Sequence, residues 1–162
     1  MKIQLDYKIN IEVMEGGKKK ESLSVFYREF TKAEKKEHEE LAKKFMKLYN
    51  KTQKIAKKQA TLNKKIELLE NSNQNEKALK CIDELEKLDE ELEVLEEDIN
   101  EIAGGEYEND FAEKSAKERF ETVVSGKDKE KLKQLADIKG YVEIMNLLDV
   151  AKSELEKKQS GE

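Results

Sequence analysis

The chain has 162 residues and a formal net charge of −5 at pH 7, and 43% of its residues are charged while 36% are hydrophobic. This length fits one domain or two small modules. Disordered segments lack periodic apolar residues. The apolar residues here recur at regular intervals, so the high charge indicates the solvated faces of long helices and argues against a disordered chain.

The same sequence disfavours a membrane protein and a disulfide-rich or zinc-binding one. No stretch approaches the roughly 20 apolar residues that a membrane-spanning helix requires, and the alternating N-terminus is not typical of a signal peptide. The single cysteine, Cys81, has no partner for an internal disulfide, and there is no CxxC pair for an ordinary zinc site. We therefore expect a cytoplasmic protein without membrane contact.

Residues 1–30 show the alternation that is typical of a β-hairpin. Odd-numbered apolar residues from 3 to 13 share one face of the first strand, and Gly16-Gly17 follows as a turn. The second strand carries Leu23, Val25 and Tyr27 on one face. Directly opposed residues share a face of a sheet, and a two-residue loop would oppose Ile11 to a serine. We therefore expect a loop of three or five residues.

Residues 31–103 are predicted to form an antiparallel coiled-coil hairpin. Thr31 and Glu34 are spaced as a capping box, which marks the start of a long helix. Apolar residues then recur in alternating steps of four and three, with Thr52 and Gln59 as polar interruptions. This first stripe contains Leu41, Phe45, Leu48, Ile55, Leu62, Ile66 and Leu69. After a polar loop at residues 71–75, a second stripe contains Ala78, Cys81, Leu85, Leu88, Leu92, Leu95, Ile99 and Ile102, and Gly104-Gly105 ends it.

The charges of the two helices complement each other. Nine lysines and no acidic residue lie between Glu40 and Glu67, whereas twelve acidic residues and three lysines lie from Glu76 to Glu101. Folding back about the polar loop sets the basic stretch against the acidic one. We expect interhelical ion pairs beside the seam, which favour this partner and this orientation.

Residues 106–162 are predicted to form a module of short helices that packs near the β-hairpin. Asn109 or Asp110 is expected to cap its first helix, which ends at Ser125-Gly126. Asp128 is expected to cap the second helix, and Gly140 separates it from the last one. The predicted fold class is therefore α+β and predominantly α.

The sequence offers no group of residues that would form an active site. His38 is the only histidine, and a helical zinc motif would need a second histidine at position 42, where the chain has alanine. Cys81 lies at a core heptad position, where a free cysteine behaves as a small buried hydrophobe. The lysine-rich stretch has an acidic partner helix in the same chain, which argues against nucleic-acid binding. We expect no catalytic residue, cofactor or metal, and a protein that is not an enzyme.

The layout resembles that of phage or prophage tail-assembly chaperones and related small tail-assembly proteins. The likeness is in the order of an N-terminal β-hairpin (residues 3–27), a charged helical middle and a small C-terminal helical segment (residues 120–126 and 141–145). The long coiled coil departs from the compact size of that family. The resemblance implies binding of an unassembled tail component.

The binding surface is expected on the β-hairpin and the C-terminal helices, because the Asn-rich loop offers no apolar or charged anchor. The candidate partner-binding residues are Tyr7, Ile9, Ile11, Val25, Tyr27, Phe120 and Tyr141. The alternative is that these side chains form an internal core. The open edge of the first strand would then remain as the contact, including with a second copy of the chain. We expect a protein-binding or assembly protein, or alternatively a structural coiled-coil spacer or oligomerisation module.

Overall fold

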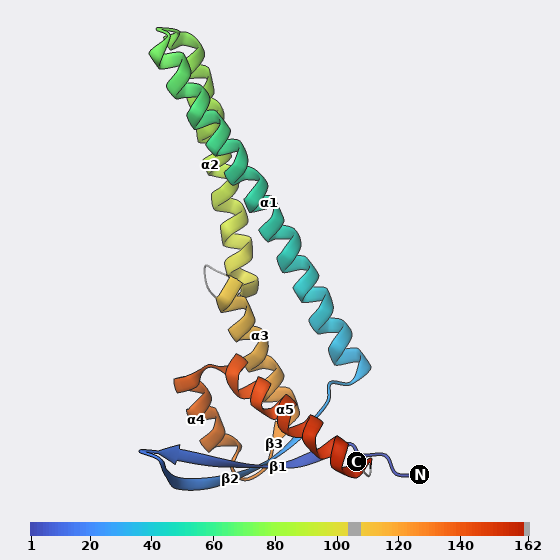
Figure 1. Ribbon diagram of the computed structural model, residues 1–162. Coiled ribbons are helices and arrows are strands. Elements are labelled where there is room, and N and C mark those ends of the chain that lie inside the picture. The colour runs from blue at the N-terminus through green and yellow to red at the C-terminus, as the bar shows by residue number, and fades with distance from the viewer. Residues whose placement is uncertain (104–107, 161–162) are drawn as a thin grey trace. The chain divides into compact units, whose positions relative to one another are not determined.

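The computed structural model describes residues 1–103 and 108–160 (Figure 1). It is predominantly helical with a small antiparallel sheet, which confirms the predicted α+β class. The elements in chain order are β1 (Asp6–Glu15), β2 (Lys18–Arg28), α1 (Lys32–Asn71), α2 (Asn75–Ala103), α3 (Glu108–Val123), β3 (Val124–Ser125), α4 (Lys129–Lys139) and α5 (Tyr141–Gln159).

The chain divides into two compact units. Unit 1 comprises Met1–His38 and Phe111–Glu162, and unit 2 comprises Glu39–Asp110. The division falls within α1 and not at the residue-30 boundary that the sequence suggested. The reason is that the first turns of α1 are bound to β2, since Arg28 forms an ion pair with Glu34 at 2.7 Å and the His38 ring lies 5.6 Å from that of Phe30.

The β-hairpin has the predicted pairing of apolar faces, but its loop is shorter than predicted. Its loop has two residues, Gly16 and Gly17, so the predicted three- or five-residue connection is wrong. Both glycines have positive φ, at 60° and 76°, as a type I′ turn requires. The register then shifts by one residue, because Val13 pairs with Glu21 while Met14 pairs with Lys19. Lys20 is the extra residue of a β-bulge.

The bulge restores the match between apolar faces. Beyond it Ile11 pairs with Leu23 and Ile9 pairs with Val25, which is the face-matched pairing that the alternation predicts. The ladder ends at the pair of Asp6 with Arg28. Residues before Asp6 have no partner on β2, so the predicted strand is too long at its start and Leu5 is exposed.

A third strand was not predicted. Val124 and Ser125 form β3, which pairs with Tyr27 and Phe26 on the edge of β2 that faces away from β1. The helix expected to continue to Ser125 therefore ends at Val123. A β-branched valine pair at positions 123–124 fits either a helix end or a strand, and pairing with β2 decides between them.

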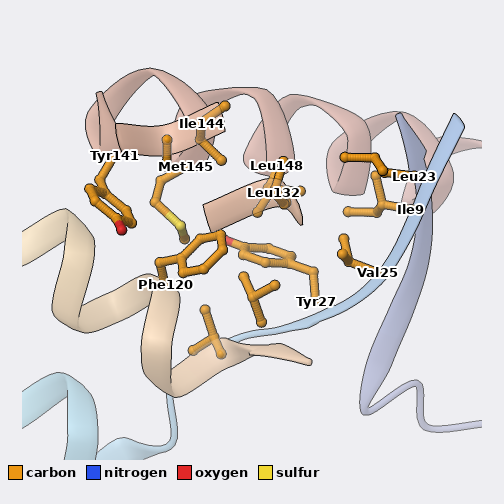
Figure 2. Close-up of a cluster of buried hydrophobic side chains, with 13 residues drawn as sticks. Ile9, Leu23, Val25, Tyr27, Phe120, Leu132, Tyr141, Ile144, Met145 and Leu148 are labelled. Atoms are coloured by element: carbon orange, nitrogen blue, oxygen red, sulfur yellow. The ribbon is translucent and has the colours of Figure 1, made fainter. Parts of the chain in front are cut away.

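Unit 1 has one hydrophobic core between the sheet and α3, α4 and α5, which cover one face of the sheet (Figures 1 and 2). The sheet and the end of α3 contribute Ile9, Leu23, Val25, Tyr27, Phe120, Val123 and Val124. The last two helices contribute Leu132, Ala136, Tyr141, Ile144, Met145 and Leu148. Among the described residues, every buried side-chain nitrogen or oxygen has a hydrogen-bond partner. This core is therefore closed and internally satisfied.

Unit 2 is the predicted helical hairpin. The predicted stripes of α1 and α2 are buried or half-buried along their length, and the fully buried members are Phe45, Ile55, Ala78, Cys81 and Ile99. The tip is a Schellman motif with Asn73 in the left-handed region at φ 57°. The Gln74 N–H donates to the Leu69 carbonyl at 2.9 Å, and the Asn73 N–H donates to that of Glu70 at 3.1 Å. The glycine pair Gly104-Gly105 lies outside the described residues.

The opposite charges of α1 and α2 lie near one another, but the described residues do not form the close interhelical ion pairs that the sequence predicted. Lys51, Lys58 and Glu91 line the same groove beside the seam, so the complementary charges do lie on one flank. Within the described residues, however, no ion pair of 4.0 Å or less joins an α1 lysine to an α2 carboxylate. A direct polar contact across the helices is the hydrogen bond from Gln59 to Asp89. The charges therefore act across solvent, where each pair contributes little to stability.

Phe45→Ala is expected to lower the free energy of unfolding of unit 2 by about 3–5 kcal/mol, because it removes a ring that is 1% exposed and leaves a cavity. The measurement is urea unfolding of the full chain followed by circular dichroism. Met46→Ala is the matched control, since its side chain is 43% exposed; it should cost less than about 1 kcal/mol. Equal effects would show that the seam has been assigned to the wrong face of α1.

Glu34→Gln is expected to lower the melting temperature at neutral pH but not near pH 2. Hydrogen bonds from Arg28 and from the Thr31 backbone N–H lower the pKa of Glu34 to about 2, from an ordinary value of 4.5. A lowered folded-state pKa means that the charged carboxylate stabilises the fold above about pH 4.5 and that this contribution is lost as the pH falls towards 2. The measurement is the melting-temperature gap between variant and wild type across that range. A gap that does not narrow, or one reproduced by the exposed control Glu37→Gln, would contradict this role.

Candidate protein-interaction surface

The structure separates the seven candidate partner-binding residues into two groups. Ile9, Val25, Tyr27, Phe120 and Tyr141 are buried members of the unit 1 core. Tyr7 and Ile11 are half-buried and pack against that core. Five of the seven side chains are therefore turned inward and offer no surface to a partner in this fold. Their burial corresponds to the alternative in which the apolar and aromatic residues form an internal core.

Tyr27 is held by a polar network that joins three elements. The Arg119 guanidinium binds Asp149 through two nitrogens, at 2.7 and 3.2 Å, and also donates to the Tyr27 hydroxyl. The Tyr27 hydroxyl in turn donates to Asp149. Burial raises the pKa of the Tyr27 phenol far above its ordinary value and the bond to Asp149 raises it further, against the opposing effect of Arg119. The phenol is thus neutral and engaged, and the network fastens β2, α3 and α5 together.

Two carboxylates fix the starts of α4 and α5. Glu113 of α3 accepts hydrogen bonds from the backbone N–H groups of Tyr141 at 2.8 Å and Val142 at 3.2 Å, which satisfies the first turn of α5. Asp128 does not cap α4 with its side chain, contrary to prediction. It accepts from the backbone N–H of Ser24 on β2 at 2.8 Å instead. Helices α4 and α5 are therefore pinned to neighbouring elements at their N-termini.

Helix α5 is apolar on two faces. Its inner face carries core residues such as Ile144 and Leu148. Its opposite side carries Val142, Leu147 and Val150, which are 36%, 54% and 58% exposed. We call these three residues the outer face of α5. Large apolar side chains grouped in this way on a surface commonly mark an interaction site.

A groove lies along the outer face of α5. Its volume is about 460 Å³, and the outer-face residues line it together with Glu113, Lys139, Glu143 and Asn146. The sequence predicted a last helix after Gly140 but did not separate its inner from its outer apolar residues, because apolar residues at adjacent positions such as 147 and 148 lie on different sides of a helix. One sequence feature could have revealed the outer face of α5, because this helix has more apolar residues than one face can hold.

The free edge of β1 is a second feature of unit 1. The strand order is β1-β2-β3, so β1 is hydrogen-bonded to a strand on one side only in the part of the chain that the structure describes. It has ten residues and no proline. Its unpaired N–H and C=O groups can accept another strand.

The residues with metal-binding or nucleophilic potential are not grouped into a site within the ranges described. In the ranges described, no three His, Cys, Asp or Glu side chains are grouped to hold a metal ion. His38 is half-buried beside Phe30. Cys81 is a free, buried thiol inside unit 2, which confirms the core position that its heptad spacing predicted. None of the described helices is long and apolar enough to cross a bilayer.

No known protein family, curated protein or solved structure matches this chain.

Proposed function

We propose that this is a non-enzymatic protein-binding or assembly protein that contacts its partner through the outer face of α5. The observation that carries the proposal is that Val142, Leu147 and Val150 are exposed beside a groove although the core of unit 1 is already closed. Burying a large aliphatic side chain stabilises a complex by up to about 1.5–3 kcal/mol, so covering these residues would favour association with a partner.

The groove favours an amphipathic helix as the bound segment. A helix presents apolar side chains three and four residues apart, which matches a groove that follows another helix. Glu143 and Lys139 are among the residues that line the groove. A partner helix with apolar anchors flanked by charges of both signs would complement them. The hydrogen bonds of Glu113 to the start of α5 keep this surface ordered before binding, which lowers the entropic cost of association.

A phage tail-assembly chaperone-like role is the more specific form of this proposal. The layout of the sequence supports it, and the client would be an unassembled tail component that exposes an apolar segment. We further propose a cytoplasmic location, which a single buried free cysteine supports.

A structural coiled-coil spacer or oligomerisation module is the second candidate. The observation that favours it is the heptad stripe of unit 2, with Thr52 and Gln59 as polar interruptions, along helices of 40 and 29 residues. A spacer needs no apolar surface on α5, so the two candidates differ in what they require of the outer face.

Leu147→Lys combined with Val150→Lys is expected to abolish partner binding, because it places two charges where apolar contact is required. The measurement is the soluble yield of a phage tail component when it is co-expressed with each variant. The matched control is Val94→Lys, since Val94 on α2 is 58% exposed like Val150. It should keep wild-type activity.

Circular dichroism of each variant is the check that it keeps the wild-type fold. Equal client solubility with the wild type and the double variant would remove the outer face of α5 from the function. If no client depends on the chain and truncation of unit 2 is the change that disrupts its assembly, the spacer function replaces the proposed one.

A further inference from the structure

The free edge of β1, which has no strand beside it in the part of the chain that the structure describes, can accept a further strand. The residues of β1 alternate between two environments. Tyr7, Ile11 and Val13 face the helices and remain half-buried, while Lys8 and Glu12 lie on the opposite, exposed face. Half-burial at an edge strand leaves apolar side chains with room for a further strand beside them.

A second copy of β1 can be tested against this edge, register by register. In an antiparallel pair, directly opposed residues share a face, so a residue must oppose one of the same parity. This condition excludes every register in which an even-numbered residue would oppose an odd-numbered one. The registers that remain place one residue of β1 opposite itself, on a twofold axis.

Charge and the length of overlap distinguish among the remaining registers. With Tyr7 on the axis, Asp6 opposes Lys8, but only residues 6–8 of the two strands overlap. With Lys8 or Glu12 on the axis, like charges oppose each other. With Ile9 on the axis, Asp6 opposes Glu12. With Ile11 on the axis, Lys8 opposes Met14. With Asn10 on the axis, Lys8 of each copy opposes Glu12 of the other, which gives two opposite-charge pairs and overlaps residues 6–14.

We propose that β1 pairs antiparallel with β1 of a second copy, with Asn10 on the twofold axis. The same register opposes Ile9 to Ile11 and Tyr7 to Val13 on the inner face, each pair occurring twice. Cross-strand pairs of β-branched and aromatic residues are favourable in antiparallel sheets. The two hairpins then form one continuous sheet, and the free edge of β1 is removed in both copies.

A competing interaction within one copy is weak. Glu12 lies 3.7 Å from Lys19 of β2, and both side chains are more than half exposed. An exposed pair of this kind contributes little and leaves Glu12 available to Lys8 of the other copy. The proposal is independent of the outer face of α5, which lies on another element.

Charge reversal tests the proposal without altering the core. Lys8→Glu and Glu12→Lys each set like charges in opposition twice, and each is expected to weaken the dimer by about tenfold or more. The double variant restores two opposite-charge pairs and should dimerise like the wild type. An equimolar mixture of the two single variants should form a heterodimer, because each supplies the charges that the other opposes.

Light scattering coupled to size exclusion gives the mass, which should be twice 18.8 kDa for the wild type and the double variant and tend to 18.8 kDa for the single ones. A monomeric wild type at high concentration would overturn the proposal. A dimer that is insensitive to both reversals would overturn it as well and would place the interface elsewhere. Circular dichroism of each variant separates a loss of pairing from a loss of folding.

A crosslink tests the register itself. In a Cys81→Ala background, Asn10→Cys should give a disulfide-linked dimer under mild oxidation, because opposed residues in an antiparallel pair have Cα atoms about 4.5–5.5 Å apart. Asp6→Cys is the control, because position 6 in the two copies would be eight residues apart in register, or roughly 27 Å. Crosslinking at position 6 but not at position 10 would contradict this register.

Discussion

The register of β1 on β2 is the constraint on which the rest of unit 1 depends. The bulge at Lys20 turns Leu23, Val25 and Tyr27 to the same face as Ile9 and Ile11. Without that extra residue to follow the two-residue glycine turn, every side chain of β2 beyond it would point to the other face. Helices α3, α4 and α5 would then have no apolar surface to cover.

Besides its apolar face, β2 positions the helices through hydrogen bonds at separate residues along its length. At Ser24 it holds Asp128 and with it the start of α4, and at Tyr27 it binds Arg119 and Asp149 from α3 and α5. Its last residue, Arg28, fixes the capping box of α1. The apolar core supplies most of the stabilisation, because it removes the larger area from water. The polar contacts define where each helix begins.

Periodicity in the sequence predicted those elements whose environment follows from their own residues. The heptad stripes of unit 2 could be assigned in full, because each core heptad position, whether apolar or polar like Gln59, faces one partner helix. The Thr31–Glu34 capping box forms as its spacing predicts. The face-matched pairing of Ile9 with Val25 could also be derived, because only one parity places apolar residues together. These features depend on residues that are near one another in sequence or that repeat at a fixed interval.

The features that escaped prediction depend on partners distant in sequence. A β-bulge and a loop lengthened by one residue both shift the register of the two strands by one residue. Matching the apolar faces therefore could not distinguish a bulge at Lys20 from a longer turn. Val124 becomes a strand residue because Tyr27, nearly a hundred positions earlier, offers it an edge. Asp128 leaves the cap position for the Ser24 N–H, which no local pattern reveals. The burial of Val25 and Phe120, which were candidate partner-binding residues, also depends on distant partners. The helices that cover them could not be assigned an inner and an outer face from the sequence alone.

The two units use charge in opposite ways, and this difference bears on how each can associate. In unit 2 the lysines of α1 and the carboxylates of α2 share a flank without close ion pairs among the described residues, so their attraction is long-ranged and tolerant of position. Such charges select which helix lies against which but specify no atomic register. On β1 the charges lie at fixed intervals on a pleated strand, where a shift of two residues removes the attraction between Lys8 and Glu12. Charge on an edge strand can therefore specify a register that charge on a solvated helix cannot, and it does so next to apolar side chains that a second strand would cover.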